Sequence, residues 1–311
     1  MSAALLCPLC GAEGAVELFR AGNGYPIVRC GSCRLAFTDD RDAPPPSTLY
    51  PAFDQSKTVG LSAVRSALSV FLRQREAVVR AVAREGRLLD FGCGAGAFAR
   101  WMAARGYEVV GLEPFSLGEE QREGHLRLVR QPLDAAAPTL GRFEVITLWH
   151  VLEHLRDPVP VLQQLKGLLA PGGAIVVSVP NFDSWQRKLF GGGWFHLDPP
   201  RHLLHFEPGT LEDCLSRAGL RTERGWGFIP EYGSSGWLQS ALNRVLPHQN
   251  FLYELAKDRG ALASLSLGER AAHLAGSAAL GAPVLAASLP LELAAAATGS
   301  GAAITVSARV R

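Results

Sequence analysis

The segment from residue 88 to residue 98 constrains the fold more than any other part of the chain. It reads Leu-Leu-Asp-Phe-Gly-Cys-Gly-Ala-Gly-Ala-Phe, so a short apolar run leads into three glycines at alternate positions. Apolar residues then recur at helical spacing from Ala97 to Arg105. Because glycine has no Cβ, it accepts positive φ and lets a ligand lie against the backbone at the start of a helix. The segment predicts a strand, a tight turn and a helix that together bind a cofactor.

Two acidic residues near this turn bear on which cofactor it binds. The glycine spacing also fits the fingerprint of dinucleotide-binding turns, which alone is a weak signal. Asp90 lies two residues before the first glycine, where a carboxylate could attract a cationic amino group. A site for a pyrophosphate would gain nothing from a negative charge at this position. A second predicted strand, residues 107–112, ends at Glu113, which is placed to accept hydrogen bonds from a ribose in either class. Asp90 therefore argues against a dinucleotide.

The turn and three later segments resemble the class I S-adenosylmethionine-dependent methyltransferases. Residues 89–96 look like the first motif of that family, 143–148 like its fourth strand, 150–155 like the segment after it, and 169–173 like the turn before its fifth strand. The resemblance implies an α/β fold with a Rossmann-like, mostly parallel sheet of seven strands. It also implies S-adenosylmethionine as the cofactor.

In that family the residues around the turn and the next strands hold the cofactor. Asp134 follows a predicted third strand, at a position where a carboxylate often meets the adenine amino group; a surface carboxylate without a role is the alternative. Trp149 and His150 are placed to contact the sulfonium side, where an aromatic face stabilises a cation. The expected cofactor-binding residues are Asp90, Gly92, Gly94, Gly96, Glu113, Asp134, Trp149 and His150.

Two Cys-x-x-Cys pairs near the start of the sequence predict a metal site. They are formed by Cys7, Cys10, Cys30 and Cys33, with 19 residues between the pairs. Four thiolates at such spacing bind zinc tetrahedrally, and a closed site of this kind is structural. A ribbon this small buries too little apolar surface to fold alone, so zinc would supply its folding energy. Iron, disulfides and a redox dithiol stay open as alternatives.

Composition and length bound the partners and the domains. The 31 basic and 29 acidic residues leave a net charge of +2, so nucleic acid is not an expected partner. The first six residues lack the basic flank and apolar length of a signal peptide, which predicts a cytoplasmic location. We expect a zinc ribbon at 1–42, a linker and leading helix at 43–85, and a methyltransferase domain at 86–311 with a helical insertion at about 230–300.

The segment at 185–206 is predicted to face the acceptor substrate. It follows a buried strand and carries three histidines, an arginine and aromatic residues beside glycines. A branch of the methyltransferase class that often has an N-terminal zinc knuckle pair has a similar Trp-then-Pro-Arg-His pattern here. His202 is the candidate general base, with a structural hydrogen-bonding role as the alternative. Arg201 is the second candidate catalytic residue, and the candidate substrate-binding residues are Trp194, His196 and His205.

Residues 274–291 form an uncharged stretch inside the expected insertion. Its 18 residues equal the minimal length of a membrane-spanning helix, but Pro283, Pro290 and many weakly apolar alanines disfavour a span. We favour a buried or lid-like pair of helices. A peripheral membrane contact through about 271–298 is the second interpretation.

These observations predict an enzyme that transfers a methyl group to a small-molecule acceptor. A sugar of surface-polysaccharide or secondary metabolism is the first expectation, and a lipid- or quinone-like acceptor at the membrane surface is the second. An NAD-dependent oxidoreductase and a non-catalytic zinc-ribbon adaptor are the alternatives of other classes. The methylated atom and the oligomeric state are left open by the sequence.

Overall fold

The computed structural model describes residues 4–44, 49, 62–115, 120–227, 230–246, 248–253 and 265–311. Most of the linker predicted after residue 43 lies outside these residues. The chain forms two compact units, which we describe separately. The ribbon unit comprises Met1–Asp42, Pro180–Pro208 and Gly227–Ile304, and the sheet unit comprises Ala43–Val179, Gly209–Trp226 and Thr305–Arg311.

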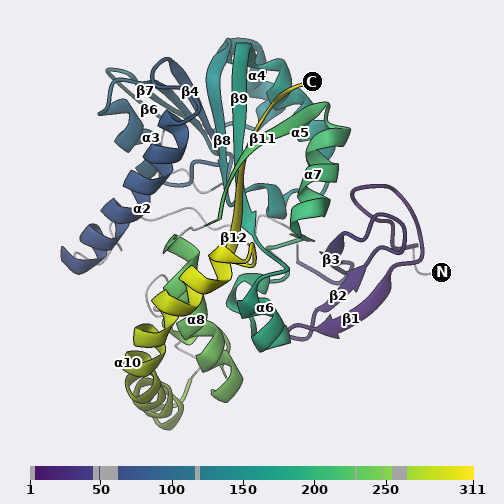
Figure 1. Cartoon of the computed structure of the whole chain (residues 1–311), viewed down its shortest axis with the longest axis vertical. Helices are drawn as coiled ribbons and strands as arrows, with labels where there is room; N and C mark the ends of the chain where they lie inside the picture. Colours follow the sequence, from purple (N-terminus) through teal and green to yellow (C-terminus); the bar gives the residue numbers. More distant parts are fainter. Residues whose placement is uncertain are drawn as a thin grey trace. The chain divides into compact units, whose positions relative to one another are not determined.

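The sheet unit is built on a sheet of eight strands in the order β11-β12-β9-β8-β4-β5-β7-β6 (Figure 1). The run from β9 to β7 is parallel, whereas β6 is antiparallel to β7 and β12 is antiparallel to β11. The strands are β4 (Arg87–Phe91), β5 (Glu108–Leu112), β6 (Gln121–Glu123), β7 (Leu126–Val129), β8 (Phe143–Trp149), β9 (Leu169–Pro180), β11 (Leu220–Trp226) and β12 (Ala303–Val310). This confirms the mostly parallel, Rossmann-like sheet.

The expected strand count of seven is wrong, because the sheet has eight strands. The added strand, β6, is three residues long and folds back along β7 through a turn at Gly124, where φ is 53°. Its sequence is Gln-Arg-Glu and it lies at the edge of the sheet. A strand with no apolar face has no alternating pattern to reveal it in the sequence.

Helices cover the sheet and close its core. They are α2 (Ser62–Arg80), α3 (Ala97–Ala103), α4 (Leu133–Leu140), α5 (Pro158–Gly167), α7 (Pro208–Arg217) and the short 3₁₀ helix η2 (Leu152–His154). Val79 of α2 and Met102 of α3 pack with Leu88, Val145 and other strand residues in one buried cluster. The central strands have almost no exposed side chains, as expected of parallel strands covered on both faces.

The ribbon unit contains a second, antiparallel sheet in the order β1-β2-β3-β10. Its strands are β1 (Val16–Arg20), β2 (Pro26–Arg29), β3 (Ala36–Thr38) and β10 (Leu204–His205). Ile27 of β2 shares a buried cluster with Phe182 and Trp194. The predicted ribbon therefore completes its sheet and its core with residues that lie far along the chain, which supplies the apolar contacts that a small ribbon lacks.

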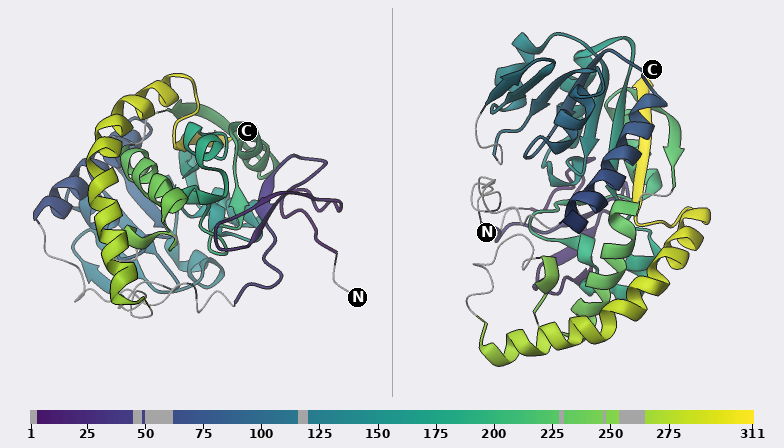
Figure 2. Two further views of the ribbon diagram at one scale, coloured as in Figure 1. Left: turned by 90° about the horizontal axis from the view of Figure 1, so that it is seen from below. Right: turned by 90° about the vertical axis from the view of Figure 1, so that its left-hand side faces the viewer.

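The helical insertion expected before the last strand is present in the ribbon unit. Its described helices are α8 (Pro230–Val245) and α10 (Leu267–Ala297), which pack side by side (Figure 2). The helix α10 curves along its length and contains Pro283 and Pro290, residues that bend a helix because each removes a backbone donor. Other helices of the unit are α6 (Trp185–Phe190), η3 (Gly191–Gly193) and η4 (Phe195–Leu197).

Candidate functional site

The glycine turn between β4 and α3 has an open face at one of its three glycines. Gly92, Gly94 and Gly96 have φ values of 73°, 53° and 77°, so all three adopt the left-handed region. A Cβ on Gly92 would collide with the side chain of Val151, and a Cβ on Gly96 would lie 2.8 Å from Leu128. A Cβ on Gly94 would meet nothing within 4 Å. Two of the glycines are therefore required by packing, and Gly94 leaves room for a ligand against the backbone.

Glu113 connects the end of β5 to this turn. Its Oε2 accepts a hydrogen bond of 3.3 Å from the backbone N–H of Gly94, and its Oε1 accepts one of 2.9 Å from Phe115. The backbone N–H of Gly92 also donates to the carbonyl of Leu112 at 2.8 Å. The acid predicted from the end of the second strand thus lies beside the open glycine.

Asp90 is buried in β4 with 3% of its surface exposed. Burial raises its pKa to about 6, against the opposing effect of a hydrogen bond from Thr147 and of the charge of Arg75. The Thr147 hydroxyl in β8 donates to Oδ1 of Asp90 at 2.9 Å. A cationic group bound beside Asp90 would lower this pKa again and offset the cost of burying the carboxylate.

The end of β8 carries the other predicted cofactor residues. Trp149 packs edge-to-face on Phe98, with ring centroids 5.6 Å apart, and the guanidinium of Arg75 lies 5.1 Å from the Trp149 ring centroid. The indole N–H of Trp149 is buried and makes no hydrogen bond to any residue that the structure describes. His150 has a φ of 56°, and its Nδ1 lies 3.3 Å from Oε1 of Glu153.

Two further buried polar residues belong to this region, Thr147 and Glu153, and of these only Thr147 was not singled out from the sequence as part of the site. Thr147 is a buried polar residue within the apolar strand β8, and that interruption was the available signal. Glu153 is 1% exposed, and desolvation raises its pKa to about 8. A carboxyl group with such a pKa is mostly protonated at neutral pH, which is common among groups in functional sites.

Asp134 lies apart from this buried group. It is exposed in the first turn of α4, and its Oδ1 accepts a hydrogen bond of 2.7 Å from Gln164. Its role toward adenine stays a prediction.

The candidate acceptor residues take up two different kinds of position in the ribbon unit. Trp194 is 2% exposed and packs on Phe182, and its Nε1 donates to Gln186 at 3.4 Å. His205 lies 3.0 Å from the hydroxyl of Thr38, which itself donates to the carbonyl of His202 at 2.8 Å. Trp194 and His205 thus connect the β3–β10 region to its core.

His196 and His202 instead line a cavity of about 420 Å³. Desolvation lowers the pKa of His196 to about 4 and that of His202 to about 3, so both rings are neutral at physiological pH. Arg201 forms an ion pair with Asp198, with 2.7 Å between Nη2 and Oδ1. The expectation that His202 is a base is untested, and a pKa of about 3 makes its neutral form a hydrogen-bonding group rather than a strong base.

A family model described as "Methyltransferase domain" matches residues 67–224, which is just over half of the chain. The chain belongs to this methyltransferase family. Ubiquinone biosynthesis O-methyltransferase of Psychrobacter cryohalolentis is 39% identical over 105 residues, which are 30% of this chain and 41% of that protein. The enzyme of the same name from Cereibacter sphaeroides is 30% identical over 168 residues, covering 50% of this chain and 68% of that protein.

One solved structure matches this chain at low identity. The crystal structure of Burkholderia thailandensis 1,6-didemethyltoxoflavin-N1-methyltransferase, with bound 1,6-didemethyltoxoflavin and S-adenosylhomocysteine, has a TM-score of 0.41 and 17% identity. The match covers 65% of this chain and 91% of that one.

The present chain spans about two fifths of the length of the first curated relatives that it matches.

The residues of the glycine turn fit S-adenosylmethionine chemically. A methionyl ammonium group matches the buried carboxylate of Asp90, and the nucleoside matches the open backbone at Gly94 beside Glu113. This fit needs a ligand that carries both an ammonium group and a ribose. A dinucleotide has the ribose but no ammonium group.

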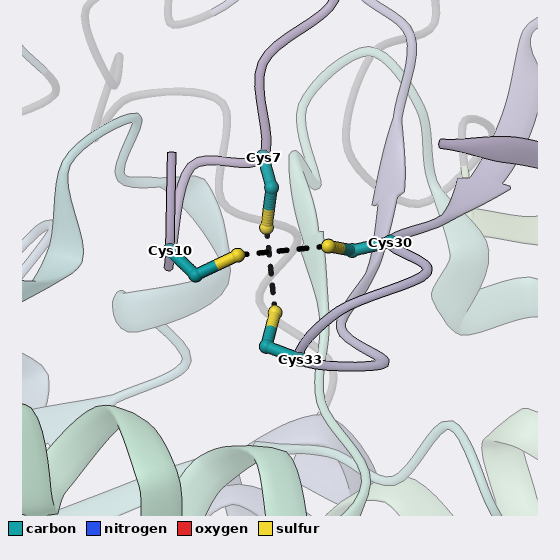
Figure 3. Close-up of side chains that lie close together, drawn as sticks. All are labelled: Cys7, Cys10, Cys30 and Cys33. Atoms are coloured by element: carbon teal, nitrogen blue, oxygen red, sulfur yellow. Dashed lines mark hydrogen bonds between the residues drawn. The ribbon is translucent and has the colours of Figure 1, made fainter. Parts of the chain in front are cut away.

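The four cysteines of the methyltransferase's ribbon converge on one point (Figure 3). The Sγ atoms of Cys7 and Cys33 are 3.4 Å apart, and those of Cys10 and Cys30 are 3.6 Å apart. A tetrahedral zinc ion with bonds of about 2.3 Å separates its sulfur ligands by about 3.8 Å, close to these values. All four cysteines are free thiols, so the cluster suits a metal ion rather than disulfides.

Proposed function

We propose that this methyltransferase transfers a methyl group from S-adenosylmethionine to a hydroxyl of an apolar, quinone-like acceptor. The observation that carries the cofactor assignment is the turn at Gly94, which is open beside Glu113 and follows the buried carboxylate of Asp90. The relatives from Psychrobacter and Cereibacter are named as ubiquinone biosynthesis O-methyltransferases, which supports the quinone-like acceptor over the sugar that the sequence suggested first.

Bound S-adenosylmethionine supplies a methyl group that its sulfonium charge has already activated. The chain's residues then have mainly to bind and align. Asp90 attracts the ammonium group, and Thr147 keeps the Asp90 carboxylate oriented. Glu113 holds the turn against the end of β5 and accepts hydrogen bonds from the ribose, so that the methyl carbon is presented in a fixed direction.

We propose that the cysteine cluster holds one structural zinc ion. With four thiolates the coordination is complete, so the ion would stabilise the ribbon and take no part in methyl transfer. The ribbon's own strands are short, with five, four and three residues, which supports a need for the metal.

We propose that α10 contacts a membrane surface, where an apolar acceptor would be found. By length and composition α10 can cross a bilayer: its most apolar window has a mean hydropathy of 1.6, and 6% of that window is buried. From residue 271 to residue 291 the helix has no Asp, Glu, Lys or Arg. Five of its exposed residues are Leu274, Leu285, Leu289, Leu291 and Leu293.

The distribution of these residues favours a surface contact over a span. With about 100° of rotation per residue, the exposed positions of α10 extend over about half or more of its circumference. This exposed surface is wider than the strip that one packed partner helix would cover. The remaining side packs on α8, and there the buried Glu292 accepts hydrogen bonds from Gln186, Trp237 and the backbone of Ala302. A helix with one polar, occupied side and one broad apolar side suits the plane of a membrane interface.

The cofactor assignment is tested by a matched pair of glycine variants. Gly94 and Gly124 both have a φ of 53°, and a Cβ would meet nothing within 4 Å at either position. Gly94→Ala and Gly124→Ala should therefore each lose a similar amount of stability, about 1–2 kcal/mol for alanine in the left-handed region. Only Gly94→Ala should weaken S-adenosylhomocysteine binding, by at least ten-fold in calorimetric titration.

The same titration includes NAD. Binding of NAD but not of S-adenosylhomocysteine by the wild-type protein would overturn the methyltransferase proposal in favour of the oxidoreductase alternative. An equal loss of nucleoside affinity in both alanine variants would show that Gly94 has no special contact with the cofactor.

A further inference from the structure

The cavity of the ribbon unit is half-open and is lined by three segments of the chain. The segment from η4 to residue 202 forms one wall, α8 forms another, and residues 252 and 253 complete it. Its volume of about 420 Å³ is in the range of small-molecule sites. The lining residues are Phe195, His196, Asp198, His202, Tyr232, Ser235, Leu238, Gln239, Leu252 and Tyr253.

Aromatic rings pack on one another around this cavity. The Phe195 and Tyr253 rings are 5.3 Å apart between centroids, and the His196 and Tyr232 rings are 4.5 Å apart. Contacts between neighbouring rings hold them in defined orientations, and their faces and edges favour a planar ring as the ligand.

The lining offers no unpaired charge to a ligand. Asp198 is the acidic residue of the lining and is bound to Arg201, whose guanidinium lies 5.8 Å from the Tyr253 ring centroid. No Lys or Arg lines the cavity among the residues that the structure describes. Among the described lining residues, a phosphate or diphosphate group, as in an activated sugar, would therefore find no cation to pair with.

Uncharged polar side chains of the lining can still form hydrogen bonds, and the contacts of the two histidines show which ring nitrogen donates. His196 Nε2 lies 3.1 Å from the carbonyl of Tyr232, and His202 Nδ1 lies 2.8 Å from the carbonyl of His196. A carbonyl only accepts, so both nitrogens carry the proton. In a neutral ring the lone pair of His196 is then on Nδ1, to which no described residue donates a hydrogen bond. Gln239, by contrast, already donates to Asn243 and accepts from the backbone of Tyr253.

We infer that this cavity binds an uncharged aromatic ring that carries a hydroxyl group, with the hydroxyl donating to Nδ1 of His196. The ring lies among Phe195, Tyr232 and Tyr253, and Leu238 contacts its apolar substituent. The identification of this ligand with the methyl acceptor rests on the proposed function. The binding of an aromatic ligand in the cavity does not depend on that function, so different experiments test the cavity assignment and the proposed function.

Three probes distinguish the ligand classes in calorimetric titration of the full chain. Propylcatechol carries the ring and the hydroxyls, propylbenzene has the ring without a donor, and UDP-glucose is a charged sugar donor. Propylcatechol should bind at least ten-fold more tightly than propylbenzene, and UDP-glucose should not bind in this cavity. Tighter binding of UDP-glucose, or equal binding of the two aromatic probes, would overturn the inference.

Two variants localise the binding. His196→Gln keeps a donor to the carbonyl of Tyr232 at the position of Nε2 but loses the Nδ1 acceptor, so it should lower propylcatechol affinity about ten-fold and leave propylbenzene unchanged. Leu238→Trp should fill the cavity and abolish binding of both aromatic probes. Its control is Val245→Trp on the same helix, where Val245 is 62% exposed and should tolerate the ring. Unchanged propylcatechol binding in Leu238→Trp would place the ligand elsewhere and overturn the inference.

S-adenosylhomocysteine is titrated into the same samples. Its binding without any preference for propylcatechol would leave the proposed function standing and overturn the cavity assignment. Propylcatechol binding that depends on His196, without S-adenosylhomocysteine binding, would support the cavity assignment and overturn the proposed function.

Discussion

In the proposed cofactor site, Asp90 and Gly94 lie four residues apart and would meet different physical requirements of one ligand. Gly94 leaves its surroundings open, whereas Asp90 is enclosed and keeps a carboxylate where water cannot solvate it. An enclosed carboxylate destabilises the free protein and binds an ammonium group strongly, because neither charge is then screened by water. The residue that supports cofactor binding is therefore expected to lower the stability of the protein without cofactor.

This expectation has a definite dependence on pH. The pKa of Asp90 is about 6 in the folded protein, and an aspartate in an unfolded chain has a pKa of about 3.9. Folding therefore favours the neutral acid. The free energy of unfolding should decrease as the pH rises from about 4 to about 6, and the whole cost should be present above that window.

Asp90→Asn removes the charge and keeps an acceptor for Thr147. We expect the cofactor-free variant to match the wild type at pH 4 and to exceed it by on the order of 2 kcal/mol at pH 7, measured by urea unfolding. The variant should also lose S-adenosylhomocysteine affinity. A variant less stable than the wild type at pH 7 would contradict the pKa assigned to Asp90.

At the scale of elements, the ribbon and the short strand β10 depend on each other. The β10 residues Leu204 and His205 pair with Phe37 and Ala36 of β3, which extends a sheet whose other strands are close to the cysteine cluster in sequence. Arg29 of β2 also forms an ion pair with Glu207, with 2.6 Å between nitrogen and oxygen. Loss of the metal should therefore disturb β10 as well as the ribbon.

Metal analysis of the purified protein tests the zinc assignment. We expect about one zinc ion per chain in the wild type and in Cys214→Ser, because Cys214 is a buried thiol of α7 outside the cluster. Cys30→Ser should lose the zinc and lower the thermal unfolding temperature, since metal binding contributes directly to folding. Iron in place of zinc, or full zinc occupancy in Cys30→Ser, would contradict the assignment.

At the scale of the whole molecule, the proposed membrane contact depends on the exposed apolar side of α10. Soluble proteins rarely leave so wide an uncharged helix surface in water, because contiguous exposed apolar patches promote association. A contact made without Lys or Arg depends on apolar burial rather than on attraction to anionic lipids. This distinguishes α10 from basic amphipathic helices.

Flotation with uncharged phosphatidylcholine vesicles tests the contact. The wild type should bind, and high salt should not release it, because screening acts on charges. The double variant Leu285→Glu/Leu289→Glu should lower binding at least ten-fold. Leu189→Glu is the matched control, since Leu189 is 64% exposed but lies on α6. Failure of the wild type to bind, or an equal loss in the control, would contradict the membrane proposal.

The amino-acid sequence by itself determined the local units of this protein. Alternate glycines after an apolar run specify a strand, turn and helix, and two Cys-x-x-Cys pairs specify four converging thiolates, because both depend on residues close together in the chain. The uncharged stretch at 274–291 was likewise readable as a helix, but a buried position, one of the arrangements favoured from the sequence, is wrong, because only 6% of its most apolar window is buried. The edge strand β6 was not readable, since its three polar residues gain their structure from β7.

Only the tertiary structure decided which of the glycines, acids and histidines in these motifs are packed in the core and which face an open space. It showed that Gly94 is open while Gly92 and Gly96 are packed, and that the buried partner of Asp90 is Thr147, 57 residues away. It separated His205, which supports β3, from His196, which lines the cavity. These assignments depend on which distant segments exclude water from a side chain, and no pattern of neighbouring residues determines that.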